Sequence, residues 1–328
     1  SATAGTAGGS LKALFEVRDG DNLENFKGKV TKADSYSLTV ENISIDNIKS
    51  LNLPDKDGKI TVNNISYSYD SWEAQVDAQG NIKSVTFNLS KDKAIADPEK
   101  TVAEGYLLNA GSAINARGIP YYMTQLNEFV RNFSEMFNQI ESKGQNLNGD
   151  TPPTFFEAIT NTAKVYDFSE SEAYSKLPDG QTATINSSSN TYYRMTAANF
   201  SVNKDVMNDV SLFATATDYV KTDSCDIVDE LKKLQSEKTV YRGDKAESFL
   251  ETIISNVSVD TEKAETYNKL YSNLEQTIAN QRTSVSGVDE DEEALNLVKF
   301  QYSYNMASKI ISVMNQMLDK LINDTGVA

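Results

Sequence analysis

A ladder of apolar residues near the C-terminus limits the possible folds of this chain more than any other feature. Its members alternate spacings of three and four residues, as in a coiled-coil seam: Leu297, Phe300, Tyr304, Ala307, Ile311, Met314, Leu318 and Leu321. A second apolar row runs beside it, through Val298, Tyr302, Met306, Ile310, Val313 and Met317. A helix that is apolar around most of its circumference must be covered. We therefore predict an interface helix, covered by its own domain or by other subunits.

Composition removes several classes of function. The chain has 328 residues, enough for more than one domain. Its 31 Lys and Arg against 47 Asp and Glu give a net charge of −16, which argues against duplex nucleic acid or an anionic membrane as partner. The absence of histidine removes the commonest general base and metal ligand. The single cysteine, Cys225, excludes an internal disulfide and a cysteine-based zinc site.

The sequence carries no targeting or membrane segment that we recognise. No uncharged apolar stretch reaches the ~18 residues of a transmembrane helix. The small and polar residues 1–9 lack the basic and apolar regions of a secretory signal. Because the chain also lacks a starting Met, we expect it to be an excised piece of a longer protein.

Alternating apolar and polar residues predict a small antiparallel β module between residues 27 and 104. We expect hairpin turns at Asp57-Gly58 and Gln79-Gly80-Asn81. The predicted strands are Tyr36–Val40, Ile60–Ile65, Trp72–Val76 and Ile82–Leu89. Strand signals at Tyr192-Tyr193 and Phe200–Val202 predict a second, smaller β-rich segment at 151–200.

Helical periodicity accounts for the rest of the chain. Ser10 is placed to cap a helix running to about Phe26, and helical character returns near Asp97. Ile119-Pro120 opens a helix that Gly144 ends. Its predicted apolar face comprises Leu126, Phe129, Val130, Phe133, Phe137 and Ile140. A short amphipathic helix follows at 225–236, and a long one starts near Lys245, after the break at 240–243.

These patterns predict an α+β multidomain fold. An elongated helical rod, built as a coiled coil or bundle, would join residues 1–26, 105–150 and 201–328. Residues 285–328 would form its terminal axial-core helix, and the two β-rich segments would be insertions.

The densest charge cluster, Asp289–Glu293, fits a helix start better than a metal site. Five adjacent acids point in all directions around a helix, whereas acids near an N-terminus favour the positive end of the helix dipole. Ser286-Gly287 or Asp289 would cap this helix, with Glu292 or Glu293 completing a capping box. We predict no metal and no cofactor.

Catalytic motifs are missing from the sequence. It contains no Gly-x-Ser-x-Gly elbow, no Walker A loop and no Gly-x-Gly-x-x-Gly loop. The many carboxylates guarantee chance pairs, but nothing marks two of them as a hydrolase pair. We predict that the chain is not an enzyme. For Tyr121-Tyr122 and Tyr192-Tyr193 we favour ordinary packing over interface contacts, and for Tyr302 and Tyr304 we favour an interface.

Residues 281–301 resemble the C-terminal signature of flagellar axial proteins. The matching positions are Ser286, Gly287, Val288 and Asp289, then Asp291, Glu292 and Glu293, then the pair Phe300 and Gln301. Residues 8–19 and 119–130, with the pairs at 137–138, 148–149 and 155–156, are similar to hook-associated members of that family. Two departures stand out: residues 27 to about 104 interrupt the helices, and the family's N-terminal region does not precede Ser1.

The resemblance implies a structural subunit of the bacterial flagellum at the junction between hook and filament. Its partners would be other copies of itself in a ring, neighbouring hook and hook-associated subunits, and an export chaperone at the C-terminal helix. It would be extracellular, exported through the flagellar type III channel without a cleavable signal. The alternatives are another axial protein of hook, rod or filament type, or a surface adhesin that uses the β module.

Overall fold

The computed structural model describes residues 9–55, 57–91, 95, 98, 102, 105–220 and 224–324. Residue contacts divide the chain into two units, Ser1–Ile254 and Ser255–Ala328. The first unit holds strands and helices and the second is helical, so the predicted α+β class is confirmed. Residues 1–8, the helical character expected near Asp97 and residues 325–328 lie outside the described part. The predicted division into a rod with two insertions stays a prediction.

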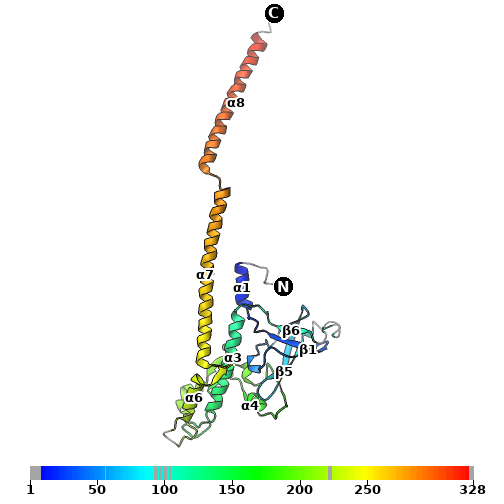
Figure 1. Ribbon diagram of the computed structural model, residues 1–328, viewed down its shortest axis with the longest axis vertical. Coiled ribbons are helices and arrows are strands. Elements are labelled where there is room, and N and C mark those ends of the chain that lie inside the picture. Colours follow the sequence, from blue (N-terminus) through cyan, green and yellow to red (C-terminus); the bar gives the residue numbers. More distant parts are fainter. Residues whose placement is uncertain are drawn as a thin grey trace. The chain divides into compact units, whose positions relative to one another are not determined.

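Six strands of the first unit close into an antiparallel barrel, to which β1, β5 and β6 in Figure 1 belong. Its six strands follow the order β3-β6-β1-β2-β5-β4, and pairing between β3 and β4 closes the ring. Strand β8 (Ala183–Asn186) adds to β4 from outside the ring, so the segment 151–200 contributes to the same sheet. The ring strands are β1 (Phe26–Asp34), β2 (Ser37–Glu41), β3 (Gly58–Val62), β4 (Ile65–Val76), β5 (Ile82–Leu89) and β6 (Leu107–Ala110).

Alternate residues of these strands fill the barrel. Trp72, Ala74 and Val76 of β4 are fully buried, as are Val85 and Phe87 of β5. The period-two pattern read from the sequence therefore points the expected side chains inward. Fully burying a large apolar side chain contributes about 1.5–3 kcal/mol, so this core stabilises the first unit.

Two predicted hairpin details were wrong. The expected strand Ile60–Ile65 is divided by a turn at Asn63 and Asn64, whose φ angles are 49° and 62°. Two consecutive positive φ angles suit the tight turns that join antiparallel strands, and asparagine tolerates them. Asp57-Gly58, expected as a turn, instead leads directly into β3.

The first helix is shorter than predicted. Helix α1 (Ser10–Asp19) ends at Gly20 instead of continuing to about Phe26. A Cβ atom on Gly20 would lie 2.7 Å from the carbonyl oxygen of Ala116, so the backbone passes too close for a larger residue. The carbonyl of Gly20 accepts hydrogen bonds from the N–H groups of Gly118 and Tyr121, at 3.0 and 3.2 Å. Gly20 thus ends one helix and holds the start of the next.

Helix α3 (Ile119–Glu141) begins where the sequence predicted and ends at Glu141, shortly before the predicted stop at Gly144. Phe129, Phe133 and Phe137 of its apolar face are partly buried against Ile227, Leu234 and Val240. Its opposite, polar face is more deeply buried than the apolar one, which the periodicity did not predict. That polar face comprises Asn127, Glu128, Arg131, Ser134, Glu135, Asn138 and Glu141.

Short elements surround α3. Helix α6 (Asp226–Ser236) is confirmed, and the expected strand at Phe200–Val202 is β9, which pairs with β7 (Phe156–Ala158). Tyr192-Tyr193, expected as a strand signal, belongs to a 3-10 helix, η3 (Tyr192–Arg194). The other short elements are η1 (Ile48–Ser50), α4 (Ser169–Ser175), α5 (Lys204–Asn208), η4 (Val210–Leu212), β10 (Thr239–Tyr241) and β11 (Asp244–Lys245).

Two long helices follow. Helix α7 (Ala246–Ser286) starts in the first unit, where the ring of Phe249 lies 4.9 Å from that of Phe129, and continues into the second. Helix α8 (Glu290–Asp324) lies wholly in the second unit. No described helix is long and apolar enough to cross a membrane.

Candidate assembly surface

The start of α8 is built as a helix cap. The Oδ1 atom of Asp289 accepts hydrogen bonds from the backbone N–H groups of Asp291 and Glu292, at 3.0 and 3.3 Å. The next four residues, Glu290 to Glu293, put their negative charge beside the positive end of the helix dipole. Capping by Asp289 is therefore confirmed. Among the described residues, no group of three or more acids or cysteines is arranged to hold a metal ion.

Gly287 of the family signature has a steric reason to be glycine. Its N–H donates to the carbonyl oxygen of Thr283 at 2.6 Å, which ends α7. A Cβ atom at this position would lie 2.2 Å from the same oxygen. Any larger residue would push the last turn of α7 away from the start of α8. The signature residues 287–289 thus form the break between two helices, directly after Ser286 at the end of α7.

The apolar ladder of α8 is exposed along its whole length. Phe300 and Tyr304 are each 73% exposed, and Leu318 is 50% exposed. The neighbouring row, including Tyr302 and Met306, is exposed as well. Exposed apolar area on this scale marks an interaction surface in a soluble protein. The structure places all eight ladder residues on one helix, and their role as an interface stays a prediction.

The tyrosine pairs differ in burial, and the interface role of Tyr302 and Tyr304 stays a prediction. Tyr192 and Tyr193 are buried, and the hydroxyl of Tyr193 donates to the carbonyl oxygen of Leu53 at 2.8 Å. Tyr121 is also buried. These side chains pack within the first unit, whereas Tyr302 and Tyr304 of α8 are exposed. Cys225, interpreted from the sequence as a small core residue or an idle thiol, is exposed and is therefore no core residue.

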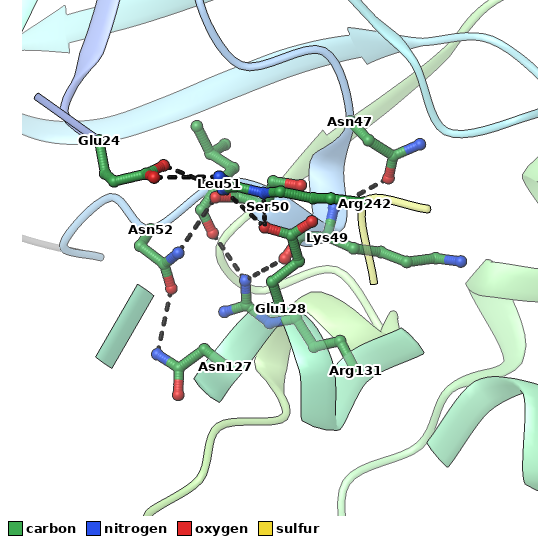
Figure 2. A network of polar contacts seen from close by, with 10 residues as sticks. All are labelled: Glu24, Asn47, Lys49, Ser50, Leu51, Asn52, Asn127, Glu128, Arg131 and Arg242. Carbon is green, nitrogen blue, oxygen red and sulfur yellow. Dashed lines mark hydrogen bonds and ion pairs between the residues drawn. The ribbon is translucent and has the colours of Figure 1, made fainter. Parts of the chain in front are cut away.

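A buried arginine joins α3 to the segment 49–51, which connects β2 to β3, and to the segment before β9. The Nη1 atom of Arg131 donates to the carbonyl oxygens of Lys49 and Leu51, at 2.8 and 2.7 Å, and Nε donates to that of Met195 at 2.9 Å. Figure 2 shows the guanidinium reaching from α3 toward the segment 49–51. Arg131 is 2% exposed, and this burial lowers its pKa to about 10. It stays charged at neutral pH and satisfies three carbonyls that lack other donors among the described contacts.

A second arginine ties the base of α7 to the rest of the first unit. Arg242, in the turn between β10 and β11, donates from Nη1 and Nη2 to both carboxylate oxygens of Glu24, at 3.0 and 2.9 Å. Its Nη2 atom also donates to Glu128 of α3 at 3.0 Å (Figure 2). Burial alone would lower the pKa of Arg242, but the bonds to Glu24 and Glu128 outweigh it and raise the pKa. Three segments far apart in sequence meet at this side chain.

Sequence reasoning missed both arginines. Arg242 and Glu24 are separated by 218 positions, so no local pattern relates them. Arg131 lies on the polar side of an amphipathic helix, where exposure is the ordinary expectation. The only usable signal was the break at 240–243, which marked a turn but not the contact that the turn makes.

Comparison with known proteins bears on the same C-terminal residues. Residues 279–324 match the family model described as flagellar basal body rod FlgEFG protein C-terminal. This range includes the end of α7, the break at Gly287 and all of α8. Flagellar hook-associated protein 1 of Bacillus subtilis (strain 168) is 33% identical over 78 residues, which are 23% of this chain and 15% of that protein. Residues 279–324 therefore belong to the C-terminal domain of the flagellar axial protein family.

Proposed function

We propose that this chain is a structural subunit of the junction between the flagellar hook and filament. The observation that carries the proposal is the exposed ladder of α8, which lies on the residues that match the axial family model. The partial likeness to a hook-associated protein favours the junction over other places along the axis. No chemistry is required of the subunit, because packing between copies is the function.

The hydrophobic effect would supply the assembly energy. Between Ala294 and Ile322 the charged residues are Lys299, Lys309, Asp319 and Lys320, so ion pairs contribute little along the ladder. Each large ladder side chain that a neighbour fully covers contributes about 1.5–3 kcal/mol. Before assembly, the same face suits an export chaperone that binds an amphipathic helix in a groove. The finished subunit would be extracellular, in the flagellum.

A double substitution on the ladder tests the proposal in cells. Ile311→Asp with Leu318→Asp places two charges on the seam, where a neighbour would have to bury them. We expect loss of the subunit from purified flagella, or loss of chaperone binding, with a normally folded first unit. The matched control is Ser312→Asp with Gln316→Asp, which adds the same charge on a polar side of α8. Normal incorporation of the ladder variant contradicts the proposal.

Deleting the gene separates this role from the alternatives. Cells with intact hooks but no filaments support the junction role. Cells without hooks indicate a rod or hook subunit, as the description of the matched family model suggests. Cells with normal filaments indicate an accessory role, such as an adhesin that uses the barrel.

A further inference from the structure

Arg131 of α3 has one terminal nitrogen that the fold does not use. Its Nε and Nη1 atoms donate to three backbone carbonyls, at 2.7 to 2.9 Å. The Nη2 atom donates to none of the described residues, and Figure 2 shows it without a bond to the residues drawn there. A guanidinium carries five N–H groups, so the two on Nη2 are left over. Since a buried donor without a partner costs free energy, these two N–H groups call for an acceptor.

The guanidinium of Arg131 also lacks a bound carboxylate within the described part of the chain. Its side chain is 2% exposed, and buried charges in proteins are normally paired. Glu128, one turn earlier on α3, acts on Arg131 electrostatically, but its Oε2 atom accepts a hydrogen bond from Arg242 at 3.0 Å. Arg131 is therefore a buried cation that backbone carbonyls solvate and no carboxylate binds directly.

A cavity of about 340 Å³ lies beside Arg131 in the first unit. Its walls come from the segment 52–55, from α3 and from residues 187–199, and Arg131 is among the residues that line it. Because Nε and Nη1 are bonded to backbone carbonyls, Nη2 is the atom of this guanidinium that remains for the cavity. The leftover donors of Arg131 thus have a space in which a ligand can meet them.

The cavity is richer in hydrogen-bond donors than in acceptors. Three asparagines line it, Asn52, Asn127 and Asn199, and the amide nitrogen of each donates one hydrogen bond within the protein, at 2.9 to 3.1 Å. An amide carries two N–H groups, so each asparagine has a second one to offer. Their three side-chain oxygens already accept hydrogen bonds from Asn127, Thr196 and Ala197. A ligand rich in acceptors suits such a wall.

The charge around the cavity is positive on balance. Arg194 supplies a second cation, with its guanidinium carbon 3.9 Å from the centre of the Tyr166 ring. Among the described lining residues, Asp55 is the one carboxylate, and it is exposed. Two guanidinium groups beside neutral amide donors suit an anion, and guanidinium groups bind carboxylates well. Asp55 opposes a bare anion but accepts a hydrogen bond from a hydroxyl group.

We propose that this cavity binds a small carboxylate that also carries hydroxyl groups, which is the chemistry of a sugar acid. Its carboxylate accepts hydrogen bonds from Nη2 of Arg131 and from Arg194, and its hydroxyl groups bond to the asparagine amides and to Asp55. The volume of the cavity is within the range of small-molecule sites, roughly 300–1,000 Å³, and has room for one sugar ring. The inference goes beyond the proposed role of α8, because these residues all belong to the first unit.

Isothermal titration calorimetry of the full chain with glucuronate tests the inference. A ligand of this size should bind with a Kd of roughly 1 mM. Glucose lacks the carboxylate and acetate lacks the hydroxyl groups, so we expect each to bind roughly tenfold more weakly or less. Absence of glucuronate binding overturns the proposal. Glucose that binds as tightly as glucuronate rejects the assigned role of the two arginines, and acetate that does so rejects a sugar acid as the ligand.

Variants at the cavity locate the binding. Arg131→Met is unsuitable, because it removes three hydrogen bonds of the fold. Ser187 is half-buried and lines the cavity, so Ser187→Phe should fill it and abolish glucuronate binding. The matched control, Ser187→Ala, leaves the cavity open and should bind within about twofold of the unchanged chain.

A second variant tests the charge of the cavity. Arg194→Gln removes one cation and should weaken glucuronate binding roughly five- to tenfold, with little change for glucose. The melting temperature from Trp72 fluorescence shows whether each variant is folded. Glucuronate binding that is undiminished in folded Ser187→Phe places the ligand elsewhere and overturns the inference, as does equal binding by folded Arg194→Gln and the unchanged chain. Flagella of cells carrying the Ile311 and Leu318 substitutions test the junction role separately.

Discussion

At the scale of single residues, Glu141 makes the first unit sensitive to pH. Its side chain is 1% exposed, and burial raises its pKa from 4.5 to about 7, although the nearby backbone N–H of Ala214 partly opposes the rise. The unfolded chain loses this proton near the ordinary pKa, while the folded chain keeps it until about 7. The contribution of Glu141 to stability is therefore complete at low pH and is lost as the pH rises through that interval.

Glu141→Gln should remove the loss of stability at high pH, since the glutamine amide carries no charge at any pH tested. We expect the melting temperature of the variant to exceed that of the unchanged chain by roughly 3–6 °C at pH 8. At pH 4, where the buried carboxyl is protonated, the two should melt within about 1 °C of each other. Thermal unfolding followed by circular dichroism measures both. A difference that does not change with pH would show that burial of the charge is not its cause.

Arg131 is expected to be among the most costly positions to change in the first unit. Arg131→Met leaves the carbonyls of Lys49, Leu51 and Met195 without their donor, which should destabilise the fold by about 3–5 kcal/mol. Arg131→Lys keeps the charge but lacks the planar fork, so it should recover only part of the loss. Urea unfolding followed by the fluorescence of Trp72, the single tryptophan, gives the free energy. A lysine variant as stable as the unchanged chain contradicts this account.

At the scale of elements, periodicity predicted what depends on one segment alone. Strand β5 has the predicted limits, and α3 and α7 begin where Ile119-Pro120 and the break at 240–243 placed them. Asn63-Asn64 was missed because its neighbours continue a strand pattern, and a turn there depends on positive φ angles. The buried polar face of α3 was missed because its partners, among them the carbonyls of Lys49 and Leu51 and the side chain of Arg242, lie in distant segments. An amphipathic pattern shows which face of a helix is apolar, but not where a distant segment needs a hydrogen-bond donor.

A single side-chain atom, Oδ1 of Asp289, caps the start of α8. Asp289→Ala removes the acceptor for the N–H groups of Asp291 and Glu292, and losing such a cap typically costs ~1 kcal/mol. We expect amide hydrogen exchange in the first turn of α8 to accelerate roughly fivefold, since that is what 1 kcal/mol allows. Exchange in α3 should not change. Glu290→Ala removes a nearby charge but leaves both hydrogen bonds of the cap to Asp289 in place, so as the control it should accelerate exchange less.

At the scale of the whole molecule, the apolar ladder of α8 could be read from the sequence because its signal is local. The eight ladder residues and the signature at 286–301 lie within the range 279–324 that matches the axial family model. The polar network of the first unit could not be predicted in the same way, because Arg242 meets Glu24 and Glu128 only after the barrel and α3 have formed. The ladder pattern depends on one helix alone, whereas the polar network forms only in the completed fold.

The two units should therefore differ in the cooperativity of their unfolding and in how it depends on protein concentration. The first has a buried core around Trp72, so its unfolding is expected to be cooperative and independent of concentration. In the second, the described residues of α8 are almost all exposed, so its helix depends on local propensity unless another copy covers it.

On heating, Trp72 fluorescence should give one sharp transition at a fixed temperature. The far-ultraviolet helical signal should include a broader transition that moves up as the protein is concentrated, because association stabilises the helix by mass action. Ile311→Asp with Leu318→Asp should abolish that shift and leave the fluorescence transition in place. If both signals change together at one temperature at every concentration, the ladder is not the surface through which copies stabilise one another.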